Sequence, residues 1–189
     1  MKKNKLTVAR RSIWFFLKIV TVSILVGALA ICFVFTGMYV GNIYIVVTEG
    51  MALRAECILQ DGSLNELSEY FTDEWLARDE LLNSDRYADY TVTNYDHRLS
   101  IRGISAMFGR REATMKVLER MASLSGKPNS DAVTGALPEW TDVLYEVTFT
   151  MDEESRWYIS DLKVIEENPP AEVKPTPDYS LLDTAEDDE

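Results

Sequence analysis

The sequence has few of the residues that build metal sites and active sites: of its 189 residues, one is a histidine, His97, and two are cysteines, Cys32 and Cys57. It contains no C-x-x-C, H-E-x-x-H or G-x-S-x-G pattern and no glycine-rich phosphate loop. A hydrolytic triad needs a nucleophile and an orienting acid that converge on the imidazole, and no serine lies in such a motif. We therefore expect no enzymatic activity, no catalytic residues, no cofactor and no metal ion.

The placement of the two cysteines excludes a disulfide between them. Cys32 falls inside a long apolar run, and Cys57 lies about 37 Å further along if one helix joins the two. That distance is far too long for an S–S bond. Cys57 is then either buried and inert or paired with another chain, and its apolar neighbours favour burial.

Residues 19–48 contain no charged side chain, and every charged side chain before them is positive. About 20 apolar residues in a helix cross a hydrocarbon layer about 30 Å thick, so the run is long enough to span a membrane. Because Lys and Arg stay on the cytoplasmic side, residues 1–12 are predicted to be cytoplasmic and the C-terminus extracytoplasmic. Residues 13–47 are predicted to form the transmembrane helix with an outward extension, and Trp14 and Tyr39 suit the two interfacial aromatic belts.

The span is predicted to stay attached as a signal anchor in the cell membrane. Residues 28–30 form an A-x-A triplet, the minimal pattern of a signal-peptide cleavage site. Cleavage sites lie where the apolar run ends, however, and here the run continues well past the triplet. Cys32 resembles a lipid-attachment site, but Ile31 stands where such a site needs a small residue. Retention is therefore the preferred interpretation.

Small residues recur four apart within the apolar run: Ser23 with Gly27, and Gly37 with Gly41. This spacing lets two helix backbones approach closely in lipid, which indicates helix pairing and a homo-oligomer. The other interpretation is that an apolar helix merely tolerates these residues, and the sequence does not decide between the two.

Beyond the apolar run the chain is strongly acidic. All 31 acidic residues lie after residue 48, with 13 of the 19 basic ones, which gives residues 49–189 a net charge of −18. Nucleic-acid phosphates and anionic lipid surfaces repel such a segment, so no nucleic acid is expected among the partners. Residues 48–166 suffice for one domain with its own core. Residues 167–189, rich in proline and acids, are predicted to be a disordered tail.

The first part of this outer domain has helical periodicity. Its apolar residues share one helical face with Arg54 off that face, which predicts a helix over residues 48–60. After a break at residues 61–62, Ser63 and Glu66 have the spacing of a capping box and are predicted to open a second helix. The buried stripe of that helix is predicted to consist of Leu64, Leu67, Phe71, Trp75 and Leu82.

From residue 90 the pattern becomes that of β-strands. Apolar residues alternate up to Ile101 and then shift phase by one residue, which indicates a strand with a bulge near Gly103. Residues 143–151 and 156–165 alternate on both sides of a polar turn and predict an antiparallel hairpin. By pattern alone residues 112–124 fit a helix and a strand equally well, because their helix-favouring residues also alternate.

The order of these elements resembles that of the nuclear transport factor 2-like fold. The resemblance covers about residues 49–166 and rests on helices followed by a bent sheet and on a closing W-x-I-x-D-L pattern at Trp157, Ile159, Asp161 and Leu162. It implies an α+β domain in which a curved antiparallel sheet wraps against helices to form a cone. It also implies that residues 112–124 are a strand, which we predict.

A short cytoplasmic start, one membrane span and an outer domain of this shape are similar to the assembly-factor subunits of conjugation and type IV secretion machines. This similarity implies a noncatalytic protein that holds other envelope proteins together, often as an oligomer. Some members of the fold superfamily instead bind apolar ligands or perform isomerase chemistry inside the cone. The residue types for that alternative occur at Tyr90, Tyr95, Tyr145, Asp96 and Asp161, although aromatic residues at strand spacing usually form plain core.

Overall fold

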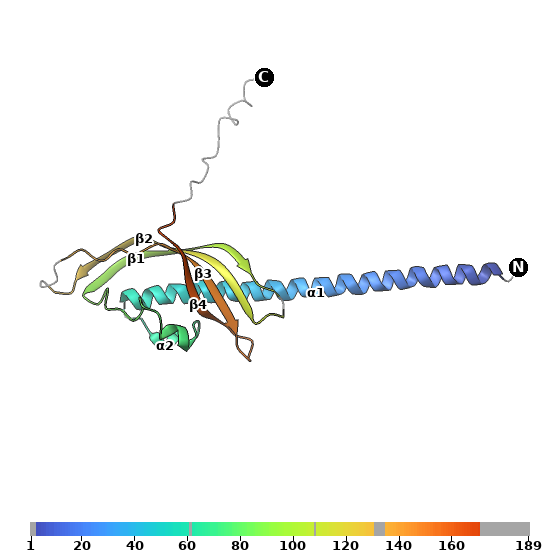
Figure 1. Ribbon diagram of the computed structural model, residues 1–189, viewed down its shortest axis with the longest axis horizontal. Helices are drawn as coiled ribbons and strands as arrows, with labels where there is room; N and C mark the ends of the chain where they lie inside the picture. Colours follow the sequence, from blue (N-terminus) through green and yellow to red (C-terminus); the bar gives the residue numbers. More distant parts are fainter. Residues whose placement is uncertain (1–2, 61, 108, 131–134, 171–189) are drawn as a thin grey trace, which may run out of the picture.

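The computed structural model describes residues 3–60, 62–107, 109–130 and 135–170, with side chains from residue 13 on. The chain is an α+β protein with one long N-terminal helix, two short helices and a four-stranded sheet (Figure 1). The helices are α1 (Lys3–Gln60), α2 (Leu64–Leu67) and α3 (Asp73–Leu76). The strands are β1 (Tyr90–Ser105), β2 (Glu112–Pro128), β3 (Val143–Met151) and β4 (Trp157–Glu167).

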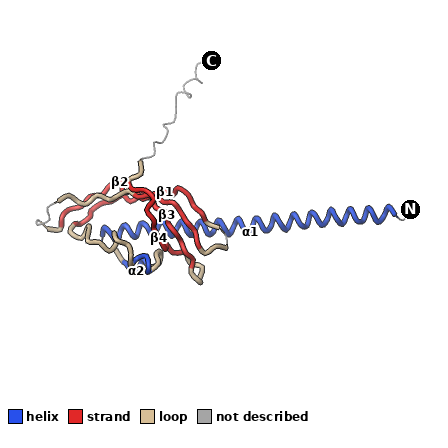
Figure 2. Tube along the Cα trace, in the orientation of Figure 1, coloured by secondary structure: helices blue, strands red, loops and turns tan. Residues whose placement is uncertain are grey.

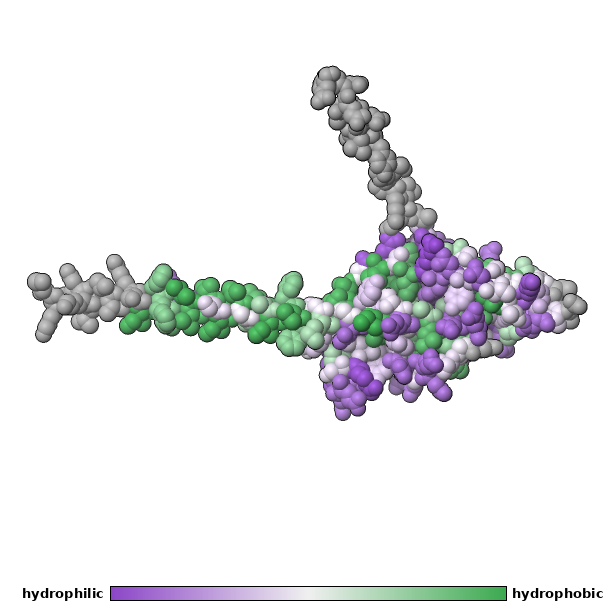
Figure 3. Space-filling view, turned by 180° about the vertical axis from the view of Figure 1, so that it is seen from behind, coloured by the Kyte–Doolittle hydropathy of each residue, from purple (hydrophilic) through white to green (hydrophobic). Residues whose placement is uncertain are grey.

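Helix α1 is continuous over 58 residues, a length of about 87 Å at 1.5 Å per residue. Its N-terminal half projects away from the rest of the molecule and exposes a surface of apolar side chains (Figure 3). By length and composition its segment Ile13–Gln60 qualifies as a membrane-spanning helix. The helix predicted over residues 48–60 is confirmed, as the C-terminal end of this longer one.

The sheet is an antiparallel meander in the order β1-β2-β3-β4, and it curves over the C-terminal part of α1 (Figure 2). The β3–β4 hairpin is confirmed, and the predicted bulge corresponds to a register shift between Ile101 and Gly103. Residues 112–124 lie in β2, as predicted. The strand forms there because Ala113, Met115 and Val117 alternate inward against the core, and this burial outweighs the helix preference of the alanine and the methionine.

The core lies between α1 and the inner face of the sheet. Ile43, Val47 and Met51 of α1 are fully buried. They belong to one cluster with the sheet residues Met115, Val117, Val147, Phe149 and Ile159. The core therefore includes α1 residues on the N-terminal side of residue 48, and the globular part and the apolar extension share one helix. Cys57 is a buried free thiol, as predicted.

The second helix was predicted wrongly. The segment after Ser63 forms two short helices, α2 and α3, separated by a turn at residues 68–70 and an isolated β-bridge at Phe71. Ser63 precedes α2, but its side chain makes no capping hydrogen bond. The helix is interrupted because the backbone N–H of Thr72 donates to the carbonyl oxygen of Ile159 in β4 at 3.0 Å, and Ile159 N–H donates back to Tyr70 at 2.7 Å.

The prediction of which side chains in that segment are buried is confirmed for the middle residues of the stripe. Leu67, Phe71 and Trp75 are buried, and Leu82 packs partly against the core. Leu64 instead has 61 % of its surface exposed. The predicted disordered tail lies outside the described residues from position 171 on.

Candidate functional site

Four charged or titratable side chains from four different segments meet inside the domain. They are Arg54 of α1, Asp79 after α3, His97 of β1 and Glu119 of β2, and we call them the Arg54 cluster. Arg54 donates two hydrogen bonds to the Asp79 carboxylate, at 2.7 and 3.1 Å. His97 Nε2 is 2.8 Å from Glu119 Oε1. Glu119 Oε2 lies 3.7 Å from Arg54 Nη1. All four side chains are at least nine-tenths buried.

The sequence predicted Arg54 to lie off the apolar face of its helix, and this prediction is wrong. Arg54 is 3 % exposed because it follows Val47 and Met51 at helical spacing and so faces the sheet. The same spacing is the signal that identifies the residue: a lone arginine in a buried helical stripe requires a buried acid. No local pattern marks Asp79 or Glu119, because their partner comes from a distant part of the chain.

The surroundings of the cluster shift the pKa values of two side chains, Arg54 and Tyr145. Burial alone lowers the pKa of Arg54, but the hydrogen bonds to Asp79 and the negative charge of Glu119 outweigh it and raise the pKa above its usual value. For Tyr145 of β3, burial raises the pKa to about 12, and the charge of Glu119 adds to the effect while Arg54 opposes it. At neutral pH Arg54 is therefore charged and the Tyr145 hydroxyl protonated.

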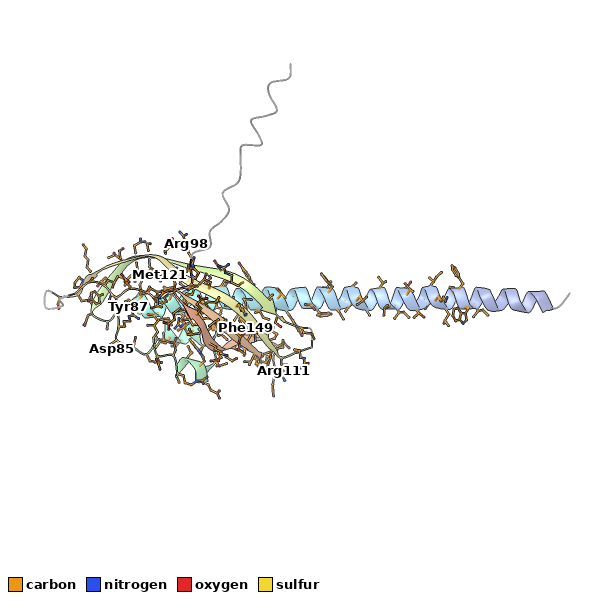
Figure 4. The ribbon with its side chains drawn as sticks, turned by 45° about the horizontal axis from the view of Figure 1, so that its top comes forward. Asp85, Tyr87, Arg98, Arg111, Met121 and Phe149 are labelled. Carbon is orange, nitrogen blue, oxygen red and sulfur yellow. The ribbon has the colours of Figure 1, made fainter. Side chains whose placement is uncertain are left out.

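A cleft of about 540 Å³ opens beside the cluster. Its walls include Arg54, Trp75, Tyr87, Trp140 and Tyr145. Figure 4 places Tyr87 on the side of the domain away from the projecting half of α1. Arg54 Nη1 and the Tyr87 hydroxyl are buried and make no hydrogen bond among the described residues. Both residues line the cleft, so a bound molecule that reached these two buried groups would supply the hydrogen bonds that they lack.

The predicted pocket residues do not gather in one place. Tyr145 and Asp161 both line this cleft. Tyr90 lines a second cleft of about 540 Å³ on the other side of Tyr87, and Tyr95 packs in a separate small apolar cluster. Asp96 is exposed, and Arg98 two residues further on holds its pKa below the usual range through a hydrogen bond. His97 is not among the residues that line either cleft.

The arrangement does not supply the groups of a hydrolytic or metal site. His97 is hydrogen-bonded to a carboxylate but lines neither cleft. Within the described ranges, no group of three or more His, Cys, Asp or Glu side chains is placed to hold a metal ion. The Arg54 cluster thus acts as a buried polar tie between the helix, the α3 segment and the sheet.

The predicted helix-pairing residues lie along the projecting part of α1. A side chain added at Gly27, Gly37 or Gly41 would meet no atom within 4 Å, so no described residue of the single chain occupies this face. At 3.6 residues per turn, Ser23 and these three glycines fall within about 80° of one another around the helix. They therefore form one stripe along one face.

Comparisons with known proteins returned no match: no family model, no curated protein and no solved structure is similar to this chain.

Proposed function

We propose that this protein is a noncatalytic single-pass membrane protein with a cytoplasmic N-terminus, whose extracytoplasmic domain binds protein partners in an envelope assembly. The observation that carries the proposal is the continuity of α1. One helix supplies both the apolar extension and the buried residues Ile43, Val47 and Met51 of the domain core. A domain joined to its anchor without a flexible linker is held at a fixed position relative to the bilayer, which suits a scaffold subunit.

The fold of the domain supports the finer part of the proposal. A long helix packed against a curved antiparallel meander, closed by a hairpin with Trp157 and Ile159 in its core, is the arrangement expected of a nuclear transport factor 2-like cone. Among membrane-anchored proteins this combination is similar to the assembly factors of conjugation and type IV secretion machines. Fold analogy alone does not establish function, so this identity of the complex is part of the proposal.

The proposal predicts crosslinks in native membranes. Treating intact membranes with a short amine-reactive crosslinker and purifying the full chain is expected to recover other envelope proteins, a second copy of the chain, or both. Mass spectrometry of the crosslinked bands identifies the partners. Recovery of the chain alone, from membranes in which a known complex does crosslink, would contradict an assembly role.

A pair of matched variants tests whether the small-residue stripe mediates self-association. Gly27→Leu places a bulky side chain on the stripe, whereas Ala28→Leu adds the same side chain about 100° further around α1. If the helices pair through the stripe, Gly27→Leu reduces the crosslinked dimer several-fold and Ala28→Leu leaves it unchanged. Equal yields for both variants would contradict pairing through this face.

The cleft beside the Arg54 cluster favours a second candidate function, binding of a small ligand. The observation is that Arg54 Nη1 and the Tyr87 hydroxyl make no hydrogen bond among the described residues, while Trp75 and Trp140 offer aromatic surfaces in the same cleft. A small polar compound with a flat ring matches this lining. In a thermal-shift screen of such compounds against the full chain in detergent, a true ligand raises the melting temperature of the native protein but not of Trp140→Ala. If no compound in the screen raises the melting temperature in this way, ligand binding in the cleft is contradicted.

A further inference from the structure

The connection between β1 and β2 lies at the end of the domain that faces the projecting half of α1. In Figures 1 and 4 this end of the sheet lies beside α1 where the helix leaves the domain, and Figure 4 labels Arg111 there. Two contacts hold this end of the domain in place. Trp157 of β4 packs edge-on against Tyr39 of α1, with ring centroids 5.8 Å apart, and Ala106 of the connection packs against the core.

This connection differs in charge from the rest of the domain. Arg110 and Arg111 are exposed, and no acidic residue occurs from position 106 to position 111. The outer segment as a whole carries −18. Ahead of the arginines, Met107 has 67 % of its surface exposed, and Gly109 turns the chain at a positive φ of 80°, a conformation that glycine adopts without strain. The described residues of the connection therefore combine an apolar tip with two cations.

The length of the apolar run sets the height of this end above the bilayer. Lys18 carries the last charge before the run, and about 20 helical residues cross the hydrocarbon layer, which ends the crossing near residue 38. Tyr39, the next residue, already contacts the domain through Trp157. The lower end of the domain thus coincides with the headgroup layer, because no residues remain between the span and the domain to separate them.

We propose that the β1–β2 connection, residues 106–107 and 109–111, docks on the extracytoplasmic surface of the same bilayer, with Arg110 and Arg111 on anionic lipid headgroups. Met107 enters the boundary between headgroups and acyl chains, where an exposed apolar side chain is stabilised. The inference rests on the proposed membrane anchor. It adds a second attachment point that prevents the domain from tilting or rotating about α1.

The neighbouring turn between β3 and β4 limits the contact to the β1–β2 side. It carries Asp152, Glu153 and Glu154, and Arg156 is paired with Asp152 and Glu154 at 3.1 and 3.2 Å. An acidic turn is repelled by anionic headgroups. The domain is therefore expected to present one edge to the lipid, and the opposed charges of the two turns determine which edge it is.

Site-specific fluorescence on the full chain in vesicles tests the proposal. In a background with Cys32→Ser and Cys57→Ala, a polarity-sensitive fluorophore is attached through Met107→Cys. The matched control is Lys127→Cys, near the far end of β2, about 50 Å from Glu112 at about 3.3 Å per residue. In vesicles containing phosphatidylglycerol, a lipid-borne quencher is expected to quench the label at position 107 strongly and the label at position 127 not at all.

Charge reversal and lipid composition test the headgroup interaction itself. The variant Arg110→Glu is expected to weaken the docked state, and so is the use of vesicles of phosphatidylcholine alone. The equilibrium constant for docking should fall by about fivefold for each arginine that no longer meets an anionic headgroup. Equal quenching at position 107 with and without anionic lipid overturns headgroup recognition. No quenching at position 107 in a chain that resists alkaline carbonate extraction overturns the docking and leaves the anchor intact. A chain that carbonate extracts from the vesicles overturns both the anchor and the docking.

Discussion

Replacing Arg54 by methionine is expected to lower the free energy of unfolding by about 3–5 kcal/mol, because the change leaves two buried carboxylates, those of Asp79 and Glu119, without their cation. Methionine keeps most of the side-chain volume, so the loss reports the missing charge and its hydrogen bonds rather than a large cavity. The measurement is denaturant-induced unfolding of the full chain in detergent, monitored by tryptophan fluorescence. A drop of this size is about a fifth or more of the 5–15 kcal/mol that stabilises a typical small domain.

The matched control for that experiment is Arg98→Met. Arg98 also forms an ion pair, with Asp96, but both side chains are exposed to solvent. Exposed pairs contribute little, so this variant is expected to unfold at the same denaturant concentration as the native protein. If Arg54→Met were as stable as Arg98→Met, the buried cluster would not be the tie between helix and sheet that its geometry indicates. The double variant Arg54→Met/Glu119→Gln should recover part of the loss, since it removes one of the stranded charges as well.

Replacing Phe71 by alanine is expected to cost about 3–5 kcal/mol, the range for deleting a fully buried aromatic side chain. Phe71 is 1 % exposed and stacks on Trp75 with ring centroids 4.6 Å apart. It also lies where the chain between α2 and α3 pairs with Ile159 of β4. Its loss should therefore loosen the α2–α3 segment before the sheet unfolds. Hydrogen exchange at Thr72 N–H, which donates to Ile159, measures that loosening directly.

Leu64→Ala is the control for the change at Phe71. The sequence places Leu64 and Phe71 in the same buried stripe, whereas the structure leaves Leu64 largely exposed. The variant is therefore expected to change the free energy of unfolding by less than about 0.5 kcal/mol. A large cost for Leu64→Ala together with a small one for Phe71→Ala would contradict the described path of this segment.

Strands were predictable from this sequence where alternation and burial agree. Residues 143–151 alternate without interruption, and each inward position from Val143 to Phe149 is buried. The bulge near Gly103 was likewise predictable from the sequence, because one extra residue in a strand moves every following side chain to the other face. Residues 112–124 were not decided by pattern, and the strand followed only from the resemblance.

The cluster and the cleft were less accessible to sequence reasoning. Tyr145 and Asp161 were named as residue types that a pocket would use, and both line the cleft. Arg54 was assigned to the wrong side of its helix, and its partners Asp79 and Glu119 were missed. The partners lie 25 and 65 positions away along the chain, so no local spacing connects them.

Composition and periodicity by themselves determined the long uncharged helix, the acidic charge of the residues after it and the closing hairpin, because each depends on properties of neighbouring residues. Only the tertiary structure decided that α1 runs unbroken from the apolar extension into the core, that Phe71 interrupts a predicted helix, and that Arg54 faces inward to two acids. These features depend on contacts between distant segments. A backbone hydrogen bond to Ile159 or a contact with a buried carboxylate can outweigh the local conformational preference of the chain. Either can do so only after the sheet has formed and brought that partner close.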